Sequence, residues 1–80
     1  MIYKAKYYPL VDGQPKEYST IVESSNKKEA EAAVRKAFID QMDKQLHMIK
    51  TWNLTVIGTS VPEIEACKEY ARENMVIEIM

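Results

Sequence analysis

Hydrophobic and polar residues alternate with a period of two near the start of the chain. In IYKAKYY (residues 2–8), the alanine and two tyrosines share one side, and the lysines and the last tyrosine share the other. This alternation predicts a half-buried β-strand. A second β-rich segment, KEYSTIVE (residues 16–23), follows Asp12-Gly13, a pair that suits a tight turn with positive φ angles. We therefore predict a β-hairpin over residues 2–23.

The hydrophobic period then changes to that of a helix. Asn26 can cap the first turn, and Glu29 is placed to complete a capping box. Apolar residues then recur every three or four positions, which predicts an amphipathic helix that extends to about residue 48. Its expected buried face consists of Ala30, Val34, Ala37, Phe38, Met42 and Ile49.

Two glutamines interrupt the apolar face of this helix. Gln41 and Gln45 fall inside the stripe, and a fully buried amide without a partner costs about 1–3 kcal/mol. Either the helix breaks or rotates near residues 38–42, or its second half leaves the core and meets a partner. In the second case the apolar surface available for contact includes Ile39, Leu46, Met48 and Ile49.

The remaining segments predict a strand, a helix and a final strand. TWNLTVIG (residues 51–58) alternates like a strand. Ser60 then suits a helix N-cap, with Glu63 at the capping-box position, and Asn74 suits the helix end. MVIEIM (residues 75–80) again alternates and predicts a strand. The apolar stripe of the second helix is expected to consist of Ile64, Cys67 and Ala71.

This order of segments predicts an α+β fold in the form of a two-layer sandwich. The order is strand, strand, helix, strand, helix, strand, and we expect one compact domain over residues 1–80. The four strands should form a mixed sheet with both helices on one face. A right-handed crossover would place the last strand parallel to the third. An 80-residue domain buries only about two-thirds of its unfolded surface, so its stability is modest.

Charge and hydropathy narrow the classes of function. Eleven basic and twelve acidic side chains give a net charge of −1, which disfavours bulk attraction to nucleic acid or anionic membranes. The sequence contains no apolar run near the roughly 20 residues that span a bilayer, and no signal-peptide pattern. A lone cysteine fits a reducing compartment. We expect a cytoplasmic protein that does not associate with membranes.

No residue pattern indicates catalysis or metal binding. His47 shares metal-ligand spacing with no cysteine, histidine or carboxylate pair, and the sequence contains no glycine-rich phosphate loop. Cys67 has three glutamates near it and only one lysine, whereas an activated thiol needs a base or a positive field. The sequence therefore predicts a protein that is not an enzyme and that uses no cofactor.

These exclusions favour a small module that binds another protein. In its size and lack of motifs, the chain resembles, as a class only, small accessory proteins of phages and mobile elements, many of which block a host factor. One form of the hypothesis is thus an inhibitor that occupies a surface of a host protein. The expected contact residues are Tyr8, Ile39, Leu46, Met48, Val76 and Met80, whose apolar or amphipathic tips can act as buried anchors. An edge position for the C-terminal strand would also allow a homodimer.

The first strand supports an alternative hypothesis of RNA binding. Lysines and an aromatic on an open sheet face are the combination that stacks and holds single-stranded RNA. Glu17 and Glu23 are expected in the same neighbourhood and weigh against it. The residues that would contact RNA are Lys4, Lys6, Tyr8 and Lys16.

Overall fold

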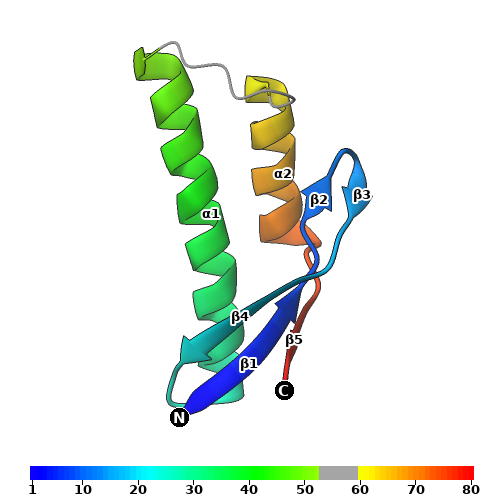
Figure 1. Cartoon of the computed structure of the whole chain (residues 1–80), viewed down its shortest axis with the longest axis vertical. Coiled ribbons are helices and arrows are strands. Elements are labelled where there is room, and N and C mark those ends of the chain that lie inside the picture. The colour runs from blue at the N-terminus through cyan, green and yellow to red at the C-terminus, as the bar shows by residue number, and fades with distance from the viewer. Residues whose placement is uncertain (53–59) are drawn as a thin grey trace.

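The computed structural model describes residues 1–52 and 60–80 of the chain (Figure 1). These residues form two helices, α1 and α2, and five strands, and strand β1 pairs with another strand on each of its two sides. The elements in chain order are β1 (Ile2–Tyr7), β2 (Leu10–Val11), β3 (Gln14–Pro15), β4 (Tyr18–Glu23), α1 (Lys27–Trp52), α2 (Val61–Glu73) and β5 (Ile77–Ile79).

The main sheet has three strands in the order β4-β1-β5. β1 pairs antiparallel with β4 along its whole length, with Ala5 opposite Thr20, so the predicted hairpin is confirmed. On its other side β1 pairs antiparallel with β5, with Ala5 opposite Ile79. The α+β class is confirmed, but the predicted four-stranded mixed sheet is wrong, because every pair among the described strands is antiparallel.

The tip of the hairpin forms a separate two-stranded ladder of β2 and β3. Asp12 and Gly13 adopt φ angles of 53° and 78°, which confirms the predicted turn with two positive φ angles. The ladder does not continue straight from β1 because Pro9 has no backbone N–H to donate. The Pro9 carbonyl instead accepts a hydrogen bond from the Lys16 N–H at 3.0 Å, and the tip turns away from the sheet.

Helix α1 is continuous and sets the length of the molecule. Its start was predicted correctly, because the Asn26 Oδ1 atom accepts a hydrogen bond from the Glu29 N–H at 2.8 Å. The Glu29 side chain accepts a hydrogen bond from the Ser25 hydroxyl. At about 1.5 Å per residue, 26 helical residues span roughly 39 Å, and the longest axis of the molecule is 40 Å. A helix break near residues 38–42, one of the alternatives that the two glutamines left open, is absent.

The third predicted strand, over residues 51–58, begins inside α1. Thr51 and Trp52 are helical, so this part of the prediction is wrong, and the rest of the segment lies outside the described residues. Adding one residue to an existing helix costs far less than starting a new element. That advantage outweighs the β preference of a threonine and a tryptophan.

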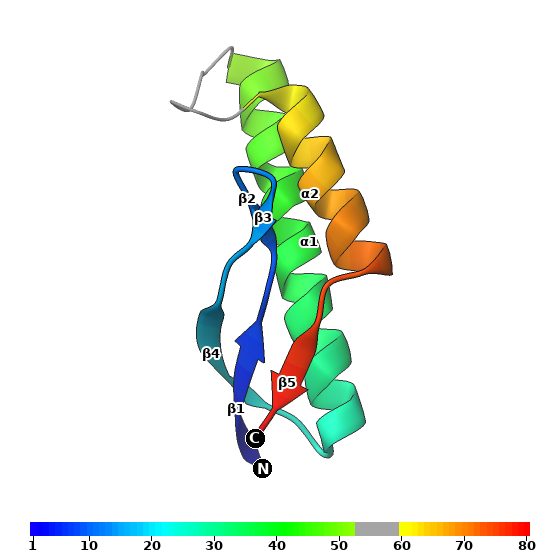
Figure 2. The ribbon, with the colours of Figure 1, turned by 90° about the vertical axis from the view of Figure 1, so that its right-hand side faces the viewer.

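Helix α2 lies beside the second half of α1 (Figure 2). Its predicted cap is confirmed, because the Ser60 hydroxyl accepts a hydrogen bond from the Glu63 N–H. The Asn74 N–H donates to the Tyr70 carbonyl at 2.7 Å where the helix ends. Only α1 packs on the three-stranded sheet, whereas α2 packs on α1 and β2. The prediction that both helices cover one face of the sheet is therefore correct for α1 and wrong for α2. Because α1 extends past the end of the sheet, α2 packs on that extension instead.

The core lies between the sheet and the first half of α1 and continues between the two helices. The predicted helical face is confirmed at Ala30 and Val34, but Ala37 is exposed. Phe38, Met42 and Ile49 are half-buried. The buried hydrophobic residues are Tyr3, Ala5, Ala30, Val34, Leu46, Ile64, Ala71 and Met75.

Candidate functional site

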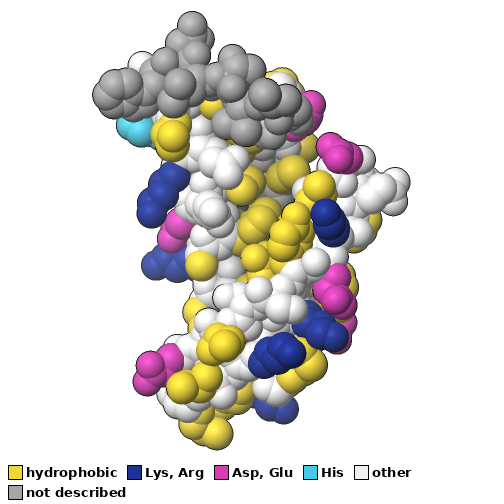
Figure 3. Space-filling view, viewed as in Figure 1, with side chains coloured by type: hydrophobic (Ala, Val, Ile, Leu, Met, Phe, Trp, Pro, Cys, Tyr) yellow, Lys and Arg dark blue, Asp and Glu magenta, His cyan; other side chains and the backbone are white. Residues whose placement is uncertain are grey.

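A groove opens between the second half of α1, helix α2 and the β2–β3 tip. Its volume is about 450 Å³. Figure 3 shows hydrophobic side chains gathered in the middle of this face of the molecule. The groove exists because the tip turns away from the sheet and approaches α2, which leaves part of α1 uncovered. We call it the α1–hairpin groove. Its lining includes Tyr7, Pro9, Leu10, Val11, Asp12, Tyr18, Phe38, Gln41, Met42, Gln45, Glu63, Ile64 and Cys67.

Three aromatic rings close the end of the groove nearest the sheet. Tyr7 stacks on Tyr18 with ring centroids 5.7 Å apart, and it meets Phe38 edge to face at 6.2 Å. Both distances are within the range of favourable aromatic pairs. β1, β4 and α1 each contribute one of these rings, so the cluster fixes the helix against the sheet. This end of the groove is therefore lined by packed aromatic rings.

The two glutamines that interrupt the apolar stripe lie on the groove wall. Gln41 is exposed and Gln45 is half-buried, and both line the groove. Among the described residues, no buried side-chain nitrogen or oxygen lacks a hydrogen-bond partner. The two amides therefore remain in contact with solvent, and their position costs the fold little free energy. One helical turn separates them, and each can donate and accept hydrogen bonds beside the apolar side chains of the groove.

Cys67 contributes a half-buried thiol to the α2 wall of the groove. The thiol donates a hydrogen bond to the Leu10 carbonyl at 3.3 Å, which links α2 to β2. Burial raises the pKa of the Cys67 thiol, and the nearby negative charge of Glu63 raises it further. A raised pKa keeps the thiol protonated at neutral pH, so this side chain is not an activated nucleophile.

The predicted contact residues on α1 lie in three different environments. Leu46 is only 9% exposed and belongs to the core between the helices, so its placement on a contact surface is wrong. Its position four residues after Met42 continues the buried stripe of an unbroken helix. Ile39 is half-buried and lines a shallow depression elsewhere on α1. Met48 is 47% exposed.

The other predicted contact residues lie near β5. Tyr8 and Val76 are neighbours, because the Tyr8 N–H donates to the Val76 carbonyl at 3.1 Å. Met80 lies apart from them, on the sheet face opposite the helices, beside Ile2 and Ile21. The six residues predicted to contact a partner are therefore not one continuous surface.

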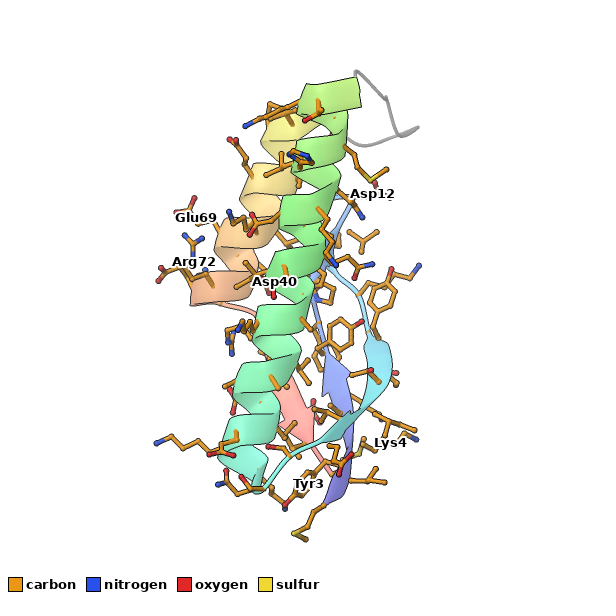
Figure 4. All side chains as sticks on the ribbon, turned by 90° about the vertical axis from the view of Figure 1, so that its left-hand side faces the viewer. Tyr3, Lys4, Asp12, Asp40, Glu69 and Arg72 are labelled. Carbon is orange, nitrogen blue, oxygen red and sulfur yellow. The ribbon has the colours of Figure 1, made fainter. Side chains whose placement is uncertain are left out.

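Acidic side chains accompany the residues predicted to bind RNA. Lys6 forms an ion pair with Glu17 at 3.8 Å, and the Tyr8 hydroxyl hydrogen-bonds the same carboxylate at 3.3 Å. A hydrogen bond with Glu78, together with the charges of both carboxylates, raises the pKa of Tyr8 to about 12. The Lys16 Nζ atom lies 6.0 Å from the centre of the Tyr18 ring. Lys4 is exposed on the open sheet face, where it points away from α1 (Figure 4).

The described residues hold no group of three or more histidine, cysteine, aspartate or glutamate side chains that could bind a metal ion. Neither described helix is long and apolar enough to cross a membrane. Comparisons with protein families, curated proteins and solved structures found no match. The geometry of the chain is thus the basis for the functional proposal.

One part of the groove could be inferred from the sequence, and the other parts could not. The glutamines marked the correct stretch of α1, because their positions conflicted with a wholly buried stripe. Leu10 and Val11 carried no such signal, since they lay between the two strands of the predicted hairpin. The contact between Leu10 and Cys67, 57 positions further along the chain, is a long-range contact that local patterns do not encode.

Proposed function

We propose that this chain is a non-enzymatic protein-binding module whose α1–hairpin groove receives an apolar segment of a partner protein. The supporting observation is a groove that combines aromatic and aliphatic side chains with polar ones, among them two solvated amides, Gln41 and Gln45, on one wall. Apolar side chains of the partner would fill the hollow, and the amides would bond its backbone. Peptide-binding grooves commonly combine apolar pockets with a few such polar groups.

The aromatic end of the groove supports this proposal. Large apolar anchors contribute most of the binding energy when they enter a well-packed pocket. Tyr7 already packs against both Tyr18 and Phe38, so these rings lose little side-chain freedom when a partner binds. A module of this kind acts by occupying a surface of its partner. Inhibition of a host factor by steric blocking is one form of this activity.

Protein binding is favoured over RNA binding because of the charges beside the predicted RNA-contact residues. Glu17 pairs with Lys6, and Glu17 and Glu78 flank the Tyr8 hydroxyl. These carboxylates would repel a phosphate backbone. RNA binding through Lys4, Lys6, Tyr8 and Lys16 remains a prediction, and it requires an affinity that falls steeply with added salt.

A pair of tryptophan substitutions on α1 tests the groove. Gln41→Trp places a large ring at the groove wall, whereas Asp40→Trp places the same ring on a neighbouring position that does not line it. Figure 4 shows Asp40 projecting outward from α1. Both residues are exposed, so both variants should fold. Immobilised wild-type and variant chains are used to capture partners from lysate. The proposal expects one protein to be retained by the wild type and by Asp40→Trp and lost with Gln41→Trp.

The single cysteine supplies an independent readout for the captured protein. Because Cys67 is the only thiol in the chain, alkylation followed by intact-mass measurement reports on the groove alone. A partner seated in the groove should slow alkylation of Cys67. Equal capture by both variants, or unchanged alkylation in the complex, would contradict the groove as the binding site. Capture of RNA with a steep salt dependence would favour the alternative function.

A further inference from the structure

Strand β4 leaves one side of its backbone without a partner strand among the described residues. The Met80 N–H donates to the Lys4 carbonyl at 2.8 Å, so the backbone polar groups of Lys4 point toward β5. Lys4 and Ile21 are therefore a non-hydrogen-bonded pair, and the N–H and C=O groups of Ile21 point outward. Backbone groups point to alternate sides from one residue to the next in a strand, so the N–H and C=O groups of Ser19 and Glu23 also point outward.

The sequence of β4 lacks the usual protection of an edge strand. Natural sheets guard their edges with proline, inward-pointing charges, bulges or very short strands. β4 has six residues, YSTIVE, with no proline and no lysine, and its pairing with β1 is uninterrupted. The opposite edge, β5, has only three residues. The long and regular edge of the sheet is thus β4, whereas the sequence predicted the C-terminal strand as the edge available for a homodimer.

The sheet face opposite the helices is also apolar next to this edge. Ile2 is 75% exposed and Ile21 is 74% exposed, and Met80 lies beside them. β-Branched side chains with this exposure on an open sheet face are an association hazard for a monomer. Ile21 is placed at the centre of the β4 edge and on this face, so it belongs to both features.

We propose that two copies of this chain pair antiparallel through β4 and form a continuous six-stranded sheet, with the twofold axis at Ile21. In an antiparallel pair, opposite residues share a sheet face, so the register must place odd-numbered residues opposite odd-numbered ones. With the axis at Ile21, Ile21 faces its own copy and Ser19 faces Glu23 of the other chain. By the twofold symmetry, Glu23 also faces Ser19 of the other chain, which makes three residue pairs. These pairs use every outward-pointing backbone N–H and C=O group of β4, and each pair exchanges two hydrogen bonds.

Registers shifted by one step leave more backbone N–H and C=O groups of β4 without a hydrogen bond. An axis at Thr20 places Ser19 opposite Ile21 and leaves Glu23 opposite Glu17, which sets like charges against each other. An axis at Val22 places Ile21 opposite Glu23 and leaves the outward groups of Ser19 beyond this ladder. Each of these registers forms two hydrogen-bonded pairs within β4, whereas the axis at Ile21 forms three. The centred register also places the exposed Ile21 side chains of the two chains opposite each other.

Charges on the open face support the same register. Lys6 lies opposite Ser19 on β4 and opposite Glu78 on β5. These three residues form a row that crosses the strands of the sheet. In the proposed pairing, Glu23 of the second chain extends this row beyond Ser19. The row then reads Glu78, Lys6, Ser19, Glu23, so one lysine lies between two carboxylates, with a small serine between Lys6 and Glu23. Lys6 and Glu23 of the second chain are two strand spacings apart, about 10 Å, and opposite charges at this distance attract weakly and favour this register.

Sedimentation of matched isoleucine variants tests the dimer. Ile21→Lys places two lysines directly opposite each other across the axis, whereas Ile2→Lys makes the same change on the same face of the central strand β1. The wild type and Ile2→Lys should sediment at twice 9.3 kDa at high concentration. For Ile21→Lys, the concentration of half-dissociation should rise by roughly tenfold or more. Circular dichroism confirms that each variant is folded.

Hydrogen exchange of the wild type tests the interface without any variant. The amide hydrogens of Ser19, Ile21 and Glu23 should exchange slowly at high concentration and quickly on dilution, because they are bonded only in the dimer. A monomer at every concentration would overturn the proposal. A dimer in which these three amides still exchange quickly, or one that Ile2→Lys weakens as much as Ile21→Lys, would overturn it equally.

Discussion

Two carboxylates control the ionisation of Tyr8. The hydrogen bond to Glu78 and the negative charges of Glu78 and Glu17 favour the neutral phenol, which raises the pKa of Tyr8 from 10.0 to about 12. Because the pKa is higher in the folded state, the phenol stabilises the fold at pH values below 10. That contribution is lost as the pH rises from 10 through 12.

Replacement of Tyr8 should remove this pH dependence. In Tyr8→Phe, the free energy of unfolding should fall less between pH 10 and pH 12 than in the wild type, because no raised phenol pKa remains. Urea denaturation at several pH values measures this difference, and comparison of tyrosinate absorbance in the two proteins gives the pKa directly. A Tyr8 pKa at its ordinary value of 10.0 in the folded wild type would contradict the prediction.

Arg35 connects α1 to the point where α2 ends and the chain turns toward β5. Its guanidinium donates to the Ala71 carbonyl at 2.5 Å and to the Met75 carbonyl at 3.1 Å, and it also pairs with Glu31 at 3.3 Å. The last carbonyls of a helix lack partners within the helix. A cation at this position satisfies them and also interacts favourably with the helix dipole.

Removal of this cation should destabilise the chain more than removal of its surface partner. Arg35→Met keeps the apolar stem and should cost about 1–3 kcal/mol, because two partly buried carbonyls lose a charged donor. Glu31→Gln removes only a solvent-exposed pair and should cost less than about 1 kcal/mol. Urea denaturation of both variants gives the comparison. Equal losses would mean that the carbonyl hydrogen bonds contribute nothing of their own.

Local signals predicted where elements begin, and distant contacts decided how they are arranged. Asn26, Ser60 and Asp12-Gly13 were interpreted correctly because each acts within a few residues of itself. The strand predicted from residue 51 was wrong at its start, since helix continuation outweighed local β preference. Nothing local revealed that α2 packs beside α1 instead of on the sheet. The groove depends on that packing, so only its glutamines were visible in the sequence.

The whole chain has a small interior, so the core and the surface of α1 should respond very differently to substitution. Leu46 lies between the helices, and Leu46→Ala should cost about 2–4 kcal/mol, a large part of the stability of a domain this size. Met48, two positions further along, is 47% exposed, and Met48→Ala should change the stability by less than about 0.5 kcal/mol. Thermal and urea denaturation measure both. A comparable loss in the two variants would mean that Met48 is also part of the core.

The two proposed contact regions lie along different parts of α1. β4 borders its first half, and the groove lies mainly along its second half, where Tyr18 at the start of β4 also lines it (Figure 1). Chains joined at β4 would leave both grooves accessible on one rigid body, and the assembly would be bivalent. A target that displays the same segment twice at a matching spacing would then be held by avidity, with an overall affinity well above that of either groove alone.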